Sequence, residues 1–90
     1  MYLDVMAHYV YIIYSASRDV YYRGYSLSPE ARLVQHNNQR SSYIRNKGPW
    51  SLVYKQSFVS KREALLREKM LKKYSKQQIL QLVLSSKNEL

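Results

Sequence analysis

The sequence predicts an α/β (α+β) domain in which helices flank a small three-stranded antiparallel sheet, in the order β-β-α-β-α-α. Two runs rich in β-branched and aromatic residues are separated by a short polar turn, and a third run follows a basic loop. Serine-based capping signals mark the starts of three helical segments. Because 90 residues are too few for two independent cores, we expect one domain over 1–90, with its core at about 8–84.

The first two strands are expected to form a hairpin. Residues 8–14 and 20–25 are rich in Tyr, Val and Ile, and the polar turn 15–19 has the length of a hairpin loop. Alternation places Tyr9 and Tyr11 on the same face of the first strand. One face must cover the core, and the other can carry a row of phenol hydroxyls. The alternative is that the tyrosines simply fill a sheet that is covered on both sides.

The first helix has a clear start. Ser28 has the character of an N-cap and Pro29 suits the first helical position, which predicts a helix over about 29–37. A polar and basic loop follows over 37–49. Residues 50–58 then predict the third strand.

Two capping boxes mark the last two helices. In such a box a Ser and a Glu or Gln three residues later exchange hydrogen bonds with each other's backbone. The box Ser60–Glu63 predicts a helix to about Lys73, and the box Ser75–Gln78 predicts a last helix to about Leu84.

The chain is strongly basic. It has 15 Lys and Arg against 6 Asp and Glu, a formal net charge of +9, which suits a polyphosphate or an anionic membrane surface. No apolar run approaches the ~20 residues of a membrane span, and the N-terminus lacks the pattern of a signal peptide. Cysteine is absent, which excludes disulfides and thiolate metal sites and fits a reducing compartment. We therefore expect a cytoplasmic protein with no membrane association.

The basic residues concentrate between Arg40 and Lys76, where only Glu63 and Glu68 oppose them. This concentration predicts binding to a nucleic-acid backbone, the alternatives being solubility or an RNA binder of the ribosomal type. The residues expected to make these contacts are Arg40, Arg45, Lys47, Arg67, Lys69 and Lys72.

Arg32 and His36 are four residues apart on the first predicted helix, so they share a face roughly opposite Val34. A guanidinium beside an imidazole suits a phosphate group. The alternative is an ordinary solvated helix face.

Glu68 falls between Ala64 and Leu71, on the stripe of its helix that should face the core. A carboxylate there needs a partner, because burying it alone is costly. Lys72, one turn on, would supply a simple salt bridge. The alternative is a divalent cation, since Mg²⁺ is often held by only one or two carboxylates. Only six acids are present in the whole chain, which favours a single-carboxylate site over a two-metal cluster.

Together these features resemble the GIY-YIG nuclease family, in the small stand-alone branch related to the N-terminal nuclease domain of the excision-repair protein UvrC. The two motifs that name the family stand here as Tyr9-Val10-Tyr11 and Tyr22-Arg23-Gly24. The Arg and the His-Asn pair of the family's next helix stand as Arg32 and His36-Asn37. The segment Ser60–Lys73 resembles the family's following helix, with Glu68 at the metal-ligand position.

The resemblance extends from about Tyr9 to Leu84, and the stretch 48–54 also resembles the third strand of small members. Two positions depart from the pattern. Tyr9 replaces the glycine of the first motif, and Arg23 replaces the apolar middle residue of the second, where it affects packing more than chemistry. The five residues that the family uses are all present.

The resemblance implies a divalent-metal-dependent endonuclease that hydrolyses DNA phosphodiester bonds with little sequence specificity, in DNA repair or processing. The alternative is a non-catalytic basic nucleic-acid-binding protein that retains the fold. Double- or single-stranded DNA would be the partner, and we expect a monomer, with a weak dimer as the alternative.

The resemblance also implies a role for each site residue. Glu68 would hold one Mg²⁺ or Mn²⁺ on the scissile phosphate. Tyr11 would act as general base, with its pKa lowered by the metal or nearby cations. Tyr22 would orient Tyr11 or the phosphate through its hydroxyl. Arg32 would stabilise the charge of the transition state. His36 would either accept the proton from Tyr11 or bind phosphate.

Overall fold

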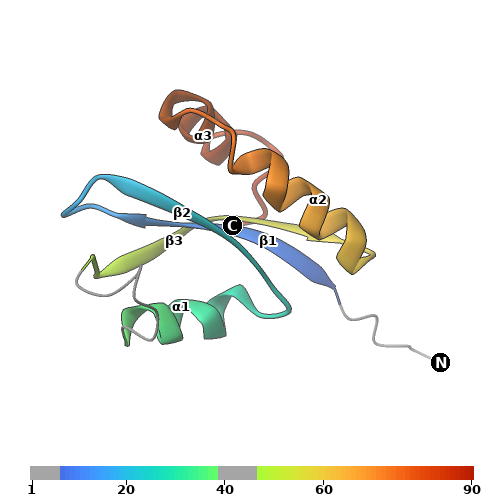
Figure 1. Ribbon diagram of the computed structural model, residues 1–90, viewed down its shortest axis with the longest axis horizontal. Helices are drawn as coiled ribbons and strands as arrows, with labels where there is room; N and C mark the ends of the chain where they lie inside the picture. The colour runs from blue at the N-terminus through green and yellow to red at the C-terminus, as the bar shows by residue number, and fades with distance from the viewer. Residues whose placement is uncertain (1–6, 39–46) are drawn as a thin grey trace.

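The computed structural model describes residues 7–38 and 47–90, which form three strands and three helices (Figure 1). The fold class and the order of elements predicted from the sequence are confirmed. Arg40 and Arg45, two of the expected nucleic-acid contacts, lie outside the described residues. The elements are β1 (His8–Ser15), β2 (Val20–Ser26), α1 (Pro29–Asn37), β3 (Trp50–Phe58), α2 (Lys61–Leu71) and α3 (Lys76–Val83).

The sheet is antiparallel with the strand order β2-β1-β3, so β1 is central. Tyr11, in the middle of β1, lies opposite Gly24 on one side and Lys55 on the other. The outer edge of β3 is met by the end of the chain, where the Glu89 N–H donates to the Lys55 carbonyl at 2.8 Å. Within the described residues no strand pairs with the outer edge of β2.

Helices cover both faces of the sheet. In Figure 1, α2 and α3 lie on one side and α1 lies on the other. The core under α2 and α3 is made by Val10, Ile12, Tyr54, Ala64, Leu71, Ile79 and Leu82. The core under α1 is smaller and contains Tyr11, Ile13 and Trp50. An open face carrying a row of phenol hydroxyls is therefore wrong, and the alternative of a sheet filled on both sides is correct.

The helix starts follow their predicted caps. The Ser28 hydroxyl accepts from the Ala31 N–H, and the Ser75–Gln78 capping box is complete. The box predicted at Ser60 is only half present. The Ser60 hydroxyl accepts from the Glu63 N–H at 3.1 Å, but no return bond from the Glu63 carboxylate joins it among the described residues.

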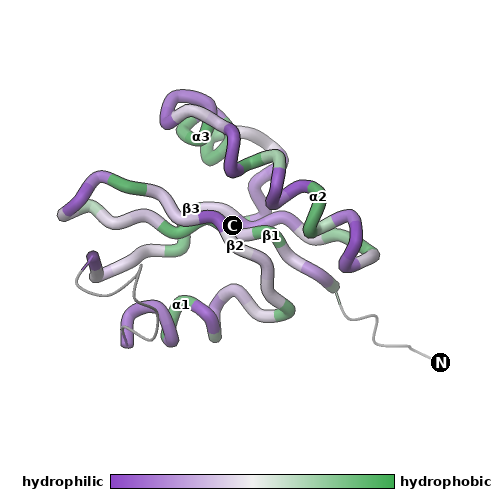
Figure 2. The backbone as a smooth tube through the Cα atoms, in the orientation of Figure 1, coloured by the Kyte–Doolittle hydropathy of each residue, from purple (hydrophilic) through white to green (hydrophobic). Residues whose placement is uncertain are grey.

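Helix α2 ends at Leu71, two residues before the predicted Lys73. The next N–H groups, of Lys73 and Tyr74, bond to carbonyls only three residues back, so the last turn tightens and the chain leaves the helix. Hydrophilic residues mark the outer turns of α2 and α3 and the β1–β2 turn (Figure 2). No helix in the described residues is both long and apolar enough to span a membrane.

Candidate active site

A buried tyrosine–histidine pair lies between β1 and α1. The Tyr11 side chain is fully buried, and its hydroxyl lies 2.8 Å from His36 Nε2. His36 is 4% exposed, whereas Val34 on the same helix is 61% exposed. Helix α1 thus turns an imidazole to the sheet and an apolar residue to solvent. The alternative that His36 lies on an ordinary solvated helix face is therefore wrong.

Helix α1 is fixed to β3 at the residue after His36. The Asn37 side chain accepts from the Trp50 N–H at 2.6 Å and donates to the Trp50 carbonyl at 3.1 Å. The edge of the Tyr22 ring also packs on His36, with ring centroids 5.2 Å apart. These contacts set the position of the imidazole relative to β1 and β2.

Gly24 provides the space that the Tyr11 side chain occupies. It is the register partner of Tyr11 on β2. A Cβ atom at Gly24 would lie 2.5 Å from Tyr11 Cζ and 2.7 Å from Cε1, distances that real Cβ atoms do not show. The sequence placed Gly24 in the second motif, but this role depends on strand register and was not predicted.

The protonation states of the pair follow from burial. Burial raises the pKa of Tyr11 to about 12, against the opposing effect of the Arg32 guanidinium. Burial, with a smaller contribution from Arg32, holds the pKa of His36 below its usual value. At neutral pH the phenol is therefore protonated and the imidazole neutral, and in the tautomer that carries its proton on Nδ1 the Tyr11 O–H donates to Nε2. The Arg32 guanidinium lowers the pKa of Tyr11, as predicted for a nearby cation, but burial outweighs it and the net shift is upward.

Arg32 and Glu68 approach the phenol from two different helices. Arg32 is exposed on α1, one turn before His36. The Glu68 carboxylate on α2 raises the pKa of Tyr11, as the weakest of the contributing charges, and the Tyr22 hydroxyl acts in the same direction. The structure thus places Tyr11, Tyr22, Arg32 and His36 together, and Glu68 on α2 is near enough for its charge to act on Tyr11.

Glu68 has the surroundings that its helical position predicted. Ala64 and Leu71, which flank it along α2, are fully buried, and its own side chain is 17% exposed. Lys72 Nζ lies 3.3 Å from a carboxylate oxygen, so the predicted salt bridge is present. The Lys72 side chain is 60% exposed, and such a pair contributes little to stability.

The donor atoms present fit one hard divalent cation. No group of three or more His, Cys, Asp or Glu side chains that could hold a metal occurs in residues 7–38 and 47–90. Glu68 offers a largely buried carboxylate whose only ion-pair partner among these residues is the exposed Lys72 side chain. Mg²⁺ and Mn²⁺ accept this arrangement because waters and substrate phosphate complete their coordination.

The described residues that were expected to bind the nucleic-acid backbone lie in three places. Lys69 and Lys72 are exposed and lie within about 100° of Glu68 around the axis of α2. Arg67 instead faces the α2–α3 turn, with its guanidinium 5.8 Å from the centre of the Tyr74 ring. Lys47 follows the loop outside the described residues, and its carbonyl accepts from the Ser15 hydroxyl.

Arg23, in the middle of the second motif, also faces the α2–α3 turn. Its Nη2 donates to the Tyr74 carbonyl at 3.1 Å, which joins β2 to the end of α2. The departure from an apolar residue at this position therefore affects packing, as predicted.

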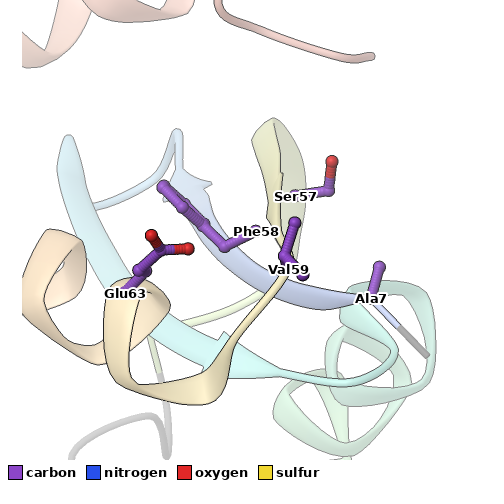
Figure 3. Close-up of a pocket in the computed structure, with 5 residues that line it drawn as sticks. All are labelled: Ala7, Ser57, Phe58, Val59 and Glu63. Atoms are coloured by element: carbon purple, nitrogen blue, oxygen red, sulfur yellow. The ribbon is translucent and has the colours of Figure 1, made fainter. Parts of the chain in front are cut away.

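A separate cavity of about 320 Å³ lies between the end of β3 and the start of α2 (Figure 3). Among the described residues that line it, Glu63 alone is ionisable, and none is one of the five predicted catalytic residues. The cavity is therefore distinct from the candidate active site. The lining residues are Ala7, Ser57, Phe58, Val59 and Glu63.

Comparison with known proteins agrees with this geometry. Residues 7–81 match the family described as the GIY-YIG catalytic domain. A UPF0213 protein of Staphylococcus haemolyticus is 39% identical over 77 residues, covering 84% of this chain and 93% of the relative. A UPF0213 protein of Clostridium perfringens is 40% identical over 79 residues, covering 87% and 84%. These family names specify no substrate.

A solved structure has the same fold. The solution NMR structure of a UPF0213 protein from Bacillus halodurans matches with a TM-score of 0.57 and 33% sequence identity. The match covers 93% of this chain and 89% of the other.

Proposed function

The chain belongs to the GIY-YIG family, and we propose that it is a divalent-metal-dependent endonuclease that hydrolyses DNA phosphodiester bonds with little sequence specificity. The observation that carries the proposal is the buried hydrogen bond of 2.8 Å between the Tyr11 hydroxyl and His36 Nε2. Burying an imidazole against a phenol brings little stability compared with an apolar pair. A proton donor and a neutral acceptor in this geometry are suited to general base catalysis.

The pair acts as a proton relay. The rise in the pKa of Tyr11 to about 12 makes a free phenolate roughly 3 kcal/mol less favourable than in water. Tyr11 therefore takes a proton from the attacking water as it passes its own proton to His36 Nε2. The water oxygen forms a bond to phosphorus, the bond from phosphorus to the 3′ oxygen breaks, and the leaving oxygen is protonated from solvent.

The remaining side chains stabilise the charge of the transition state and orient the imidazole of His36. Arg32 is exposed on the same side of α1 as His36, so its guanidinium can contact the phosphate oxygens as their charge grows. The Tyr22 ring packs on His36 and keeps the imidazole in line with the Tyr11 hydroxyl. Asn37 holds the end of α1, and with it His36, in place through its two hydrogen bonds to the Trp50 backbone.

Glu68 would hold the divalent cation. A bound Mg²⁺ or Mn²⁺ neutralises charge on the scissile phosphate and assists departure of the 3′ oxygen. Lys72, which now pairs with Glu68 at 3.3 Å, would turn to the nucleic-acid backbone once the carboxylate is engaged. The Glu68–Lys72 salt bridge would thus be replaced by a contact of Glu68 with the cation and a contact of Lys72 with the DNA backbone.

The basic residues near Glu68 would bind the DNA backbone. Lys69 and Lys72 lie on its side of α2, and Arg40, Arg45 and Lys47 lie in the sequence between α1 and β3. Backbone contacts position DNA without reading bases, which is the reason for expecting little sequence specificity. Arg67 is left out of this set because it packs on Tyr74. DNA repair or processing is the setting that such an activity fits.

A plasmid-nicking assay tests the proposal. Supercoiled DNA is incubated with the protein in Mg²⁺, Mn²⁺, Ca²⁺ or EDTA, and nicked product is expected only with Mg²⁺ or Mn²⁺. Tyr11→Phe removes the relay hydroxyl, whereas Tyr9→Phe makes the same change two residues earlier on the same face of β1 and should cut normally. DNA binding without cut strands in every metal would show a non-catalytic binding protein that retains the fold.

A further inference from the structure

A second cavity lies at the edge of the sheet, between the β1–β2 turn and the start of α3. Its volume is about 290 Å³, at the low end for a ligand pocket. None of its lining residues belongs to the proposed catalytic set. They are Asp19, Val20, Tyr21, Arg23 and Lys76, and we call this cavity the edge notch.

The walls of the edge notch are fixed by contacts within the chain. The Tyr21 ring packs on Tyr14 with centroids 4.8 Å apart. The Asp19 carboxylate accepts from the Tyr14 hydroxyl at 2.7 Å and pairs with Lys76 Nζ at 2.7 Å. Arg23 is anchored to the α2–α3 turn through its bond to a carbonyl. An aromatic ring thus lies beside two cations and one carboxylate, which leaves a net positive charge.

This composition suits a nucleotide better than other small ligands. A nucleobase stacks on a half-buried aromatic ring, and base–aromatic stacking tolerates every base. Lys76 and Arg23 would attract the phosphate of the same nucleotide. A base in a duplex has no free face to offer, so only an unpaired base can enter. The volume suits one nucleotide.

The edge notch borders the candidate active site along β2. Tyr21 and Tyr22 are neighbours whose side chains lie on opposite faces of this edge strand. On the other side, the carbonyl that anchors Arg23 belongs to Tyr74, in the turn that follows α2, three residues after the end of the helix that carries Glu68. A DNA strand that follows the outer edge of β2 would meet both sites.

We propose that the edge notch binds one unpaired nucleotide of the DNA, so that the favoured substrate carries a single-stranded tail beside the bond that is cut. This inference rests on the proposed nuclease function and adds the class of substrate. Tyr21 provides the stacking surface. Arg23 and Lys76 together provide the net positive charge, since Asp19 offsets only one of these two cations.

Binding assays in Ca²⁺ test this without requiring cleavage. Labelled hairpin duplexes with a blunt end, a 5′ tail or a 3′ tail are titrated, and fluorescence anisotropy gives the affinities. We expect one tailed DNA to bind about 5- to 150-fold more tightly than the blunt one, the contribution of one base–aromatic stack. Tyr21→Leu should reduce the tailed affinity to the blunt value and leave blunt binding unchanged.

Further variants distinguish a loss of base stacking from a loss of folding. Tyr21→Phe keeps the ring and should keep the preference for a tail. Tyr25→Leu makes the matched change four residues along, where the side chain is also half-buried on the same core but lies outside the edge notch. It should keep the preference as well. If Tyr21→Leu does not fold, Lys76→Gln, at an exposed position, should weaken tailed binding several-fold more than blunt binding.

The outcomes distinguish this inference from the nuclease proposal. Equal affinity for all three DNAs, or equal losses on all three in Tyr21→Leu, would overturn the edge notch as a nucleotide site. A tail preference that depends on Tyr21, in a protein that never nicks DNA, would support the edge notch and contradict the nuclease.

Discussion

Replacing Gly24 by Ala should separate Tyr11 from His36. The added Cβ would lie 2.5 Å from Tyr11 Cζ, whereas ordinary contact begins at 3.4 Å, so the ring must retreat by about 0.9 Å (3.4 − 2.5). If the movement is directed away from His36, the hydrogen bond lengthens from 2.8 Å to about 3.7 Å (2.8 + 0.9), beyond hydrogen-bonding distance. A misplacement of this size costs a catalytic group on the order of 100-fold in rate.

The stability cost should be moderate. Overpacking of this kind costs about 1–3 kcal/mol, which leaves a small domain folded in most cases. Nicking rates under single-turnover conditions measure the catalytic loss, and thermal unfolding with DNA affinity in Ca²⁺ measures the fold. We expect at least ~100-fold slower nicking with DNA affinity nearly unchanged.

Gly48→Ala is the matched control. Its added Cβ would lie 3.4 Å from Trp50 Cδ1, close to ordinary contact, and 3.5 Å from the Asn37 side chain. It should therefore cut at close to the normal rate. Normal nicking by Gly24→Ala would refute the reasoning, because the Tyr11–His36 contact would then be dispensable.

Three further predictions concern the charged groups and the pH. Glu68→Gln should abolish nicking in Mg²⁺ while leaving DNA affinity within a few-fold, and normal cutting would exclude the single-carboxylate metal site. Arg32→Ala should lower turnover far more than DNA affinity, and Arg32→Lys should restore part of the turnover. Lys69→Gln should weaken DNA affinity alone. Equal affinity losses in Arg32→Ala and Lys69→Gln would show that Arg32 only binds DNA. The nicking rate should rise with pH through the lowered pKa of His36, because only the neutral imidazole accepts a proton, and level off above it; a rate that still climbs near pH 10 would show that Tyr11 ionises on its own.

The elements of the fold were predictable because their signals are local. The caps at Ser28 and Ser75 fix where α1 and α3 begin, and the strands consist of residues that favour extended backbone. The end of α2 was placed two residues late, because tight bonds after Leu71 close the helix and no Gly or Pro marks the place. A helix end without such a residue leaves little trace in the sequence.

The sequence named the residues of the candidate site, but their electrostatics could not be predicted from it. The motifs identify Tyr11, His36 and Glu68 by their spacing, and the structure brings them together. The pKa of Tyr11 rises because α1 and β3 bury the phenol, and this packing joins segments far apart in the sequence. The positions of Gly24 opposite Tyr11 and of Arg67 over Tyr74 are likewise set by register and by tertiary contact.

Acids that are remote in sequence also alter the basic surface. Counting charges between Arg40 and Lys76 suggests that only two glutamates oppose them. The structure pairs Lys55 with Glu30 at 2.9 Å and Lys76 with Asp19 at 2.7 Å. Such pairs between elements have no sequence signature, so part of the expected basic surface is neutralised in the folded chain.

A double-mutant cycle on the nicking rate tests the proton relay most directly. Single-turnover rates in Mg²⁺ are measured for the unmodified protein, Tyr11→Phe, His36→Gln and the combined variant. If the two side chains act as one relay, each single change should cost about 10²–10⁴-fold, and the combined variant should be no slower than the slower single variant. Losses that multiply in the combined variant, or full activity in either single variant, would contradict the relay.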